Sequence, residues 1–171
     1  MNVQAGSPRS RFKRLLLGSN PRRTLRRSLV LAILTYLLFR YVLVPVRLRG
    51  LSMEPTFRNG SIHIANTLRY VRRDPQRGDV VVISMTGNHA FYLKRVLGLP
   101  GERIAFDAGQ LYVNHEARPE PYVPDRGTWT MPQLTVGRNE YFVAGDNRLI
   151  PMELHTLGTV NRAKIRGGLL F

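Results

Sequence analysis

The sequence predicts a mostly β protein in which one N-terminal transmembrane helix precedes an antiparallel, barrel-like sheet domain. Three observations support this prediction. One apolar run, residues 29–46, lies near the start of the 171-residue chain. Short runs rich in β-branched and aromatic residues then recur between turn-forming residues over about 120 residues, which is typical of antiparallel sandwiches and barrels. No helical pattern and no internal repeat is evident after the apolar run.

Residues 1–27 are predicted to form a basic leader. The chain has 26 Lys and Arg against 11 Asp and Glu, a net charge of +15, and such an excess often indicates a nucleic-acid or anionic-lipid partner. The excess is local, because the first 50 residues hold eleven basic side chains and no acid, which leaves residues 51–171 with +4. We therefore expect no nucleic-acid partner. The absence of cysteine excludes disulfides, thiolate metal sites and a cysteine nucleophile.

Residues 28–46 are predicted to form an uncleaved membrane anchor, since a helix over 29–46 reaches about 27 Å, just enough for a bilayer core. Arg40 is costly there but lies off centre, where it can reach the interface. A cleaved signal peptide is disfavoured because no small-x-small site follows; a buried soluble helix is the other alternative. Arginines before the run predict a cytoplasmic N-terminus in the inner (cytoplasmic) membrane. The rest of the chain would then lie on the outer, periplasmic side.

Residues 47–171 are predicted to form one extracytoplasmic, β-rich domain. Tight hairpin turns are expected at residues 107–110 and 114–116. The proline-rich segment 119–132 is expected to run over the surface outside the sheet. The predicted strands are rich in β-branched or aromatic residues between turn signals, and they cover residues 61–65, 79–84, 91–98, 103–106, 110–113, 140–144 and 164–170.

Lys94 is a candidate general base. It is the only lysine between Lys13 and Lys164 in a chain that otherwise uses arginine, and strand alternation places Tyr92 and Val96 on its face. A desolvated lysine can lose its proton near pH 7, which arginine cannot do. On these grounds alone, a strand lysine with its ammonium group in solvent is the more common alternative.

Ser52 is a candidate nucleophile, although a serine between Gly50 and Pro55 is more often a turn residue. Serine needs an adjacent base to become nucleophilic, and a serine–lysine pair is a known variant of the catalytic triad. Asp146 follows a predicted strand in a Gly-Asp-Asn turn. Its carboxylate either serves a site or caps that turn.

Four segments together resemble the type I signal peptidase family of serine–lysine peptidases. Their order and spacing agree with the family, as does the apolar run before them, so the resemblance covers residues 29 to about 160. The segments are Gly50-Leu-Ser-Met-Glu-Pro-Thr56, Arg77-Gly-Asp-Val-Val-Val-Ile83, Tyr92-Leu-Lys-Arg-Val-Leu-Gly-Leu-Pro-Gly-Glu-Arg-Ile104 and Gly145-Asp-Asn-Arg148.

The resemblance implies a membrane-anchored serine endopeptidase that removes signal peptides from exported preproteins after small residues, at Ala-x-Ala type sites. Ser52 would attack the scissile carbonyl, its backbone N–H would bind the oxyanion, and neutral Lys94 would be the general base. Arg95 and Asp146 would pair as structural support. The substrate would bind extended between the residues leading into Ser52 and the strand that carries Lys94. The implied partners are the preprotein, the lipid bilayer and the export machinery.

No cofactor is implied by the resemblance. The four histidines show no paired ligand spacing, so we expect them at the surface and predict no metal site. Trp129, in the proline-rich segment, is expected to pack locally.

The sequence departs from the family pattern after Arg148. Pro151 stands where the family usually has a serine thought to orient the lysine, and Glu153 and His155 could replace an Asp–Arg pair. Two alternatives therefore stay open: a specialised processing peptidase for one pilin-like or secretion-system substrate, and a catalytically inert, membrane-tethered scaffold descended from the family. A self-cleaving repressor peptidase is disfavoured because it would need a DNA-binding domain in place of the apolar run.

Overall fold

The computed structural model describes residues 20–84, 91–155 and 158–170. The chain divides into two units, of which the first ends at Tyr41 and the second begins at Val42. Residues 1–19 of the predicted basic leader lie outside the described ranges.

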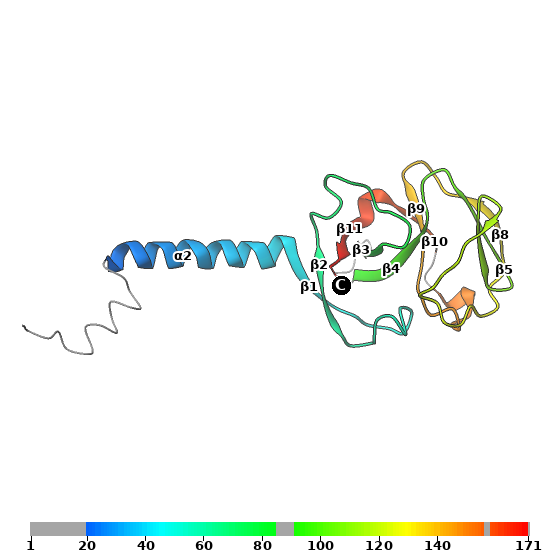
Figure 1. The fold of residues 1–171 in the computed structure, drawn as a ribbon, viewed down its shortest axis with the longest axis horizontal. Coiled ribbons are helices and arrows are strands. Elements are labelled where there is room, and N and C mark those ends of the chain that lie inside the picture. The colour runs from blue at the N-terminus through cyan, green and yellow to red at the C-terminus, as the bar shows by residue number, and fades with distance from the viewer. Residues whose placement is uncertain (1–19, 85–90, 156–157, 171) are drawn as a thin grey trace, which may run out of the picture. The chain divides into compact units, whose positions relative to one another are not determined.

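The first unit contains the helix α2, Pro21–Leu37, which continues as the π-helical turn η1, Leu38–Val42 (Figure 1). Proline at the first helical position suits the start of a helix, where its missing N–H has no partner to lose. Every large apolar side chain between Leu25 and Tyr41 is exposed. Among the residues that the structure describes, no helix has both the length and the apolar character needed to cross a membrane.

The helical segment ends earlier than residue 46, where we predicted its end. Leu43–Arg47 instead form the strand β1, which pairs antiparallel with β2, Ile62–Asn66. Pro45 has no N–H for a helical hydrogen bond, and it is tolerated here because β1 is an edge strand. The β-branched Val46 favours a strand and is buried in the core of the second unit.

The second unit begins with a seven-stranded sheet in the order β1-β2-β11-β3-β4-β9-β10 (Figure 1). All of its neighbouring strands pair antiparallel, which confirms the predicted mostly antiparallel β domain. Two short 3-10 helices, η2 (Met152–Leu154) and η3 (Arg162–Lys164), connect its later strands. The remaining strands of this sheet are β3 (Val80–Ser84), β4 (Phe91–Gly98), β9 (Glu140–Ala144), β10 (Gly158–Asn161) and β11 (Ile165–Leu169).

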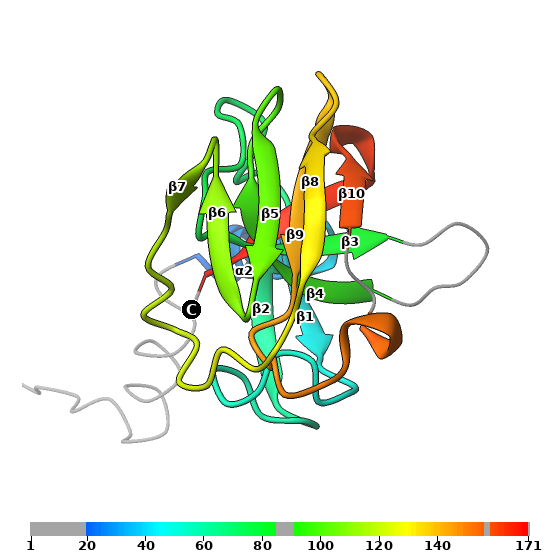
Figure 2. The same cartoon turned by 90° about the vertical axis from the view of Figure 1, so that its right-hand side faces the viewer.

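A second sheet has four strands in the order β7-β6-β5-β8, and Figure 2 shows them side by side. Both predicted tight turns lie in this sheet. Ala108 and Gly109 join β5 to β6, and Asn114 and His115 join β6 to β7, all with positive φ. Its strands are β5 (Arg103–Asp107), β6 (Gln110–Val113), β7 (Glu116–Ala117) and β8 (Met131–Thr135).

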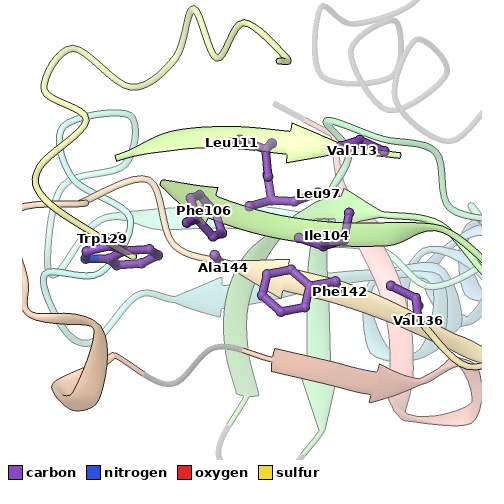
Figure 3. Packing of buried hydrophobic residues seen from close by; sticks show 9 residues of the cluster. All are labelled: Leu97, Ile104, Phe106, Leu111, Val113, Trp129, Val136, Phe142 and Ala144. Carbon is purple, nitrogen blue, oxygen red and sulfur yellow. The ribbon is translucent and has the colours of Figure 1, made fainter. Parts of the chain in front are cut away.

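The two sheets meet in a hydrophobic cluster that fixes the positions of β4 and β9. Leu97 of β4 and Phe142 of β9 pack against Ile104 and Phe106 of β5 (Figure 3). These side chains are at most 1% exposed. Because β4 carries Lys94 and β9 leads into Asp146, this core sets the framework for both candidate residues.

The proline-rich segment is not confined to the surface, as we had predicted. Glu120, Val123 and Trp129 are buried, and β8 begins within the segment at Met131. Trp129 was expected to pack locally, but it lies in the core, and its indole N–H donates a hydrogen bond to the Ile150 carbonyl at 2.8 Å. The segment can enter the core because its polar groups are satisfied there.

Candidate active site

Ser52 lies in a turn directly after β1, where its side chain is partly exposed. Gly50 enters the turn with φ of 105°, a conformation that favours glycine. The Gly50 N–H donates to the Asn59 side chain at 3.1 Å, and the Asn59 N–H donates to the Glu54 carboxylate at 3.2 Å. The buried Met53 anchors the turn in a hydrophobic cluster that includes Leu93 of β4. The candidate nucleophile is therefore held on an ordered turn.

Lys94 lies in the middle of β4, opposite Val81 of β3. Its side chain is only 3% exposed, so the alternative of a lysine in solvent is wrong. Burial lowers the pKa of Lys94 from 10.5 to about 8, while the Asp146 carboxylate acts in the opposite direction. A lysine with this pKa is partly neutral near pH 7, which a general base requires.

Arg95 and Asp146 form the ion pair that we expected. Arg95 donates two hydrogen bonds to the Asp146 carboxylate, from Nε at 2.8 Å and from Nη2 at 2.5 Å. A third goes to the Gly78 carbonyl at 2.8 Å, and the guanidinium lies 3.9 Å from the centre of the Tyr122 ring. The pair ties the end of β9 to the strand that carries Lys94.

The turn containing Ser52 is attached to the loop that follows β9. The Asn147 N–H donates to the Ser52 carbonyl at 3.0 Å, and the Asn147 side chain donates to the Leu51 carbonyl at 3.1 Å. A Cβ on Gly145 would lie 2.1 Å from the Ser52 carbonyl oxygen, so only glycine permits this approach. Ala144, one residue before Gly145, is the strand partner of Arg95. These contacts bring Ser52 beside the Lys94 strand, although the described residues include no hydrogen bond between the two side chains.

A groove runs between the chain that leads into Ser52 and the start of β4. One wall comes from residues 46–50 with Ser52 and Met53, and the other from residues 91–93. β4 pairs with β3 from Phe91 onward, but its pairing with β9 begins only at Arg95. Within the described ranges, the start of β4 therefore has no strand on its second side, where an extended peptide could add.

His155 was missed as a residue of the site. We expected a surface histidine or a partner of Glu153, but His155 is only 7% exposed and Glu153 is exposed. Of the ion pairs between described residues, none joins the two. The His155 ring packs edge-on against Trp129, with ring centres 4.8 Å apart. No spacing in the sequence indicates this position, because it depends on the core contact with Trp129.

Arg148 is a second residue whose position the sequence did not reveal. Its guanidinium is buried and forms two hydrogen bonds with the Glu120 carboxylate, at 2.9 and 2.5 Å. Its Nε donates to the Gly145 carbonyl at 2.9 Å. Arg148 therefore fixes the loop that contacts the Ser52 carbonyl. Within the described ranges, no group of three or more His, Cys, Asp or Glu could hold a metal ion.

Known proteins to which this chain is similar belong to one family. The family model described as "Signal peptidase, peptidase S26" matches residues 22–171. The chain is 30% identical over 154 residues to signal peptidase I of Bacillus licheniformis, covering 82% of each chain. It is 26% identical over 157 residues to signal peptidase IB of Staphylococcus aureus, covering 81% of this chain and 82% of that protein.

In two further matches, the alignment covers a smaller share of this chain or of the matched protein. The chain is 34% identical over 122 residues to the probable signal peptidase I-2 of Synechocystis, covering 68% of this chain and 56% of that protein. A crystal structure of a signal peptidase I from Enterococcus faecalis matches with 29% sequence identity and a TM-score of 0.48, over 57% of this chain and 97% of that chain.

Proposed function

The chain belongs to the signal peptidase family, peptidase S26, and from this premise we propose that it uses Ser52 and Lys94 to cleave signal peptides from exported preproteins. As a member of the family it is a serine peptidase, a hydrolase. The observation that carries the proposal is the buried Lys94, whose pKa is lowered to about 8 beside a groove lined by Ser52.

The proposed reaction uses Lys94 twice. At pH 7 a lysine of pKa about 8 is neutral in about a tenth of the molecules. Neutral Lys94 takes the proton of the Ser52 hydroxyl as its oxygen attacks the scissile carbonyl, and the ammonium then protonates the leaving amine. The bond to the amine then breaks and leaves an acyl group on Ser52. Neutral Lys94 takes a proton from water, which hydrolyses this acyl-enzyme and releases Ser52. The Ser52 N–H is the proposed donor to the oxyanion, supported by its having no acceptor among the described residues.

The proposed substrate binds as an extended strand in the groove. The unpaired side of β4 at residues 91–93 offers backbone hydrogen bonds to a peptide. Leu48, Met53 and Leu93 line the groove and pack in one hydrophobic cluster. A groove this small, with a volume of about 20 Å³, favours small side chains, which supports cleavage after Ala-x-Ala type sites.

The proposed anchor is the helical segment of residues 21–42, with its N-terminus in the cytoplasm. Its part after Arg27, residues 28–42, reaches about 22 Å, and the large apolar side chains from Leu29 to Tyr41 are exposed. Arg22, Arg23, Arg26 and Arg27 precede the apolar part and favour a cytoplasmic N-terminus. The β unit would then meet preproteins at the outer surface of the inner membrane, beside the export machinery.

The test uses purified full-length protein in detergent with preproteins that carry an Ala-x-Ala site. We expect cleavage by the wild type and at least about a thousandfold lower kcat for Ser52→Ala and for Lys94→Arg, because arginine keeps the charge but cannot act as a base. Ser61→Ala and Lys164→Arg are the matched controls and should keep the wild-type rate.

The outcomes separate the alternatives. Activity retained in Lys94→Arg would contradict the serine–lysine pair. A wild type inactive on a panel of signal peptides but active on one pilin-like precursor would identify a specialised processing peptidase. Inactivity on every precursor would identify an inert scaffold.

A further inference from the structure

The proposed reaction leaves one buried polar side chain unused. His155 is 7% exposed, and neither of its ring nitrogens makes a hydrogen bond of good geometry to any described residue. Buried polar groups without partners destabilise a folded protein and are rare in native structures. A phenylalanine would fill similar space against Trp129 without this cost. The presence of an imidazole here therefore calls for a functional explanation.

The His155 ring faces the residues that contact the Ser52 turn. A Cβ on Gly145 would lie 2.6 Å from Cε1 and 2.9 Å from Nε2 of His155, and 2.1 Å from the Ser52 carbonyl oxygen. The imidazole and the Ser52 backbone thus meet at one point, the end of β9. The ring also packs against Trp129, at an interplanar angle of 73°.

Burial, helped by the nearby positive charges, keeps the His155 ring neutral. Burial lowers the pKa of His155 to about 4, helped by the positive charges of Lys94 and Arg148 and opposed by the Asn147 backbone. The other charged groups nearby are already paired, since Asp146 binds Arg95 and Glu120 binds Arg148. At neutral pH the imidazole therefore has one ring nitrogen able to accept a hydrogen bond, and Lys94 is the nearby cation without an ion pair among the described residues.

We propose that His155 is a positioning residue for Lys94, and that a ring nitrogen of His155 accepts a hydrogen bond from the Lys94 ammonium group once that group has taken the proton of Ser52. The bond holds the ammonium in place until it protonates the leaving amine. This inference rests on the proposed function, in which Lys94 is the general base. It gives a role to a buried ring nitrogen that has no hydrogen bond of good geometry, and to the contact of the ring with Gly145.

The test compares His155→Phe, which keeps the ring but removes the acceptor, with His155→Gln, which keeps an amide near the position of Nε2. The chain has three lysines, so lysine labelled with nitrogen-15 gives a simple NMR spectrum of the full-length protein, and Lys94→Arg identifies the Lys94 signal. His115→Asn, at an exposed histidine in a turn, is the control and should match the wild type.

We expect His155→Phe to lower the Lys94 pKa, because the ammonium form loses an acceptor. The same variant should lower kcat about tenfold, with KM unchanged, because the amine is misplaced. Its thermal unfolding midpoint should equal or exceed that of the wild type. His155→Gln should keep the wild-type Lys94 pKa and most of kcat.

Two results would overturn the inference. One is a wild-type Lys94 pKa and kcat in His155→Phe. The other is an equal loss of kcat and of thermal stability in both variants with no change in the Lys94 pKa, which is the outcome expected of a purely structural histidine. If the wild type cleaves no preprotein, the proposed function fails, and the NMR titration still decides the contact between His155 and Lys94 by itself.

Discussion

At the scale of single residues, the balance between burial and charge decides the chemistry of Lys94. The Asp146 carboxylate favours the ammonium form, yet burial dominates and the pKa falls from 10.5 to about 8. A shift of this size corresponds to about 3 kcal/mol. Arg95 binds both carboxylate oxygens of Asp146, which leaves less of its charge available to Lys94. The ion pair thus ties the site together without forcing the lysine to stay charged.

The pH dependence of cleavage should follow Lys94. Since the neutral amine is the base, kcat/KM should rise with pH and level off above about pH 8. Asp146→Asn removes a charge that raises the Lys94 pKa. The increase of kcat/KM should therefore occur at lower pH in this variant. The same variant leaves Arg95 buried and unpaired, which should lower the free energy of unfolding by about 3 kcal/mol or more. Rate profiles against pH and urea unfolding measure the two effects.

Glu116→Gln is the matched control for that prediction. Arg118 and Glu116 form an ion pair with side chains 46% and 71% exposed. Its loss should change the free energy of unfolding by less than about 1 kcal/mol and leave the pH profile unchanged. The electrostatic argument would be contradicted if the increase of kcat/KM in Asp146→Asn occurred at the wild-type pH or at a higher pH.

At the scale of elements, β4 combines two environments in eight residues. Its second half is paired on both sides and packs in the core, and its first half keeps one side open beside the groove. Gly98 marks the close approach of the two sheets, since a Cβ there would lie 2.7 Å from the Ile104 side chain. The doubly paired half positions the strand, and Lys94 lies at the end of the open half, next to Arg95, where the pairing with β9 begins.

Two glycines with nearly the same φ angle test how closely the β5–β6 turn packs against the chain beside it. Gly101 and Gly109 have φ of 82° and 80°, but a Cβ on Gly101 meets open space, whereas one on Gly109 would lie 2.4 Å from the Gly127 carbonyl. Gly101→Ala should cost about 1–2 kcal/mol of unfolding free energy from backbone strain alone. Gly109→Ala should cost clearly more, because the β5–β6 turn must also move. Equal losses in urea unfolding would contradict the close approach.

At the scale of the whole molecule, the two units have different roles. The three hydrophobic clusters of the protein's described part all come from residues after Val42, so the β unit has its own core. The helical unit has its apolar side chains exposed. Folding and the proposed catalysis are therefore properties of the β unit, and membrane attachment is the proposed role of the helix.

Deleting residues 1–41 tests this division. The shortened chain should unfold within about 2 °C of the full chain by circular dichroism, because its core is intact. It should fail to sediment with phospholipid vesicles, whereas the full chain should bind them. Vesicle binding by the shortened chain would contradict the proposed anchor, and failure to fold would contradict the independence of the β unit.

The local sequence determined much of the framework of this protein. Alternating β-branched residues and turn-forming residues predicted seven strands to within one residue at each end, together with both tight turns, because these patterns depend on neighbours along the chain. Four strands were missed. β1 and β8 each contain a proline, at Pro45 and Pro132, and the short β7 and β10 are strands only through their pairing partners. Ser52 and Lys94 were selected by the resemblance of their motifs, and their roles stay a prediction.

Tertiary structure alone decided the environment of the candidate site. That Lys94 is buried depends on sheets assembled from segments far apart, as do the burial of His155 against Trp129 and the pairing of Arg148 with Glu120. Gly145 could be recognised as a contact point only when the Ser52 carbonyl was seen beside it. Strand period and turn chemistry are local, whereas desolvation and electrostatic fields depend on what the folded chain places around each group, and these set the pKa of a lysine.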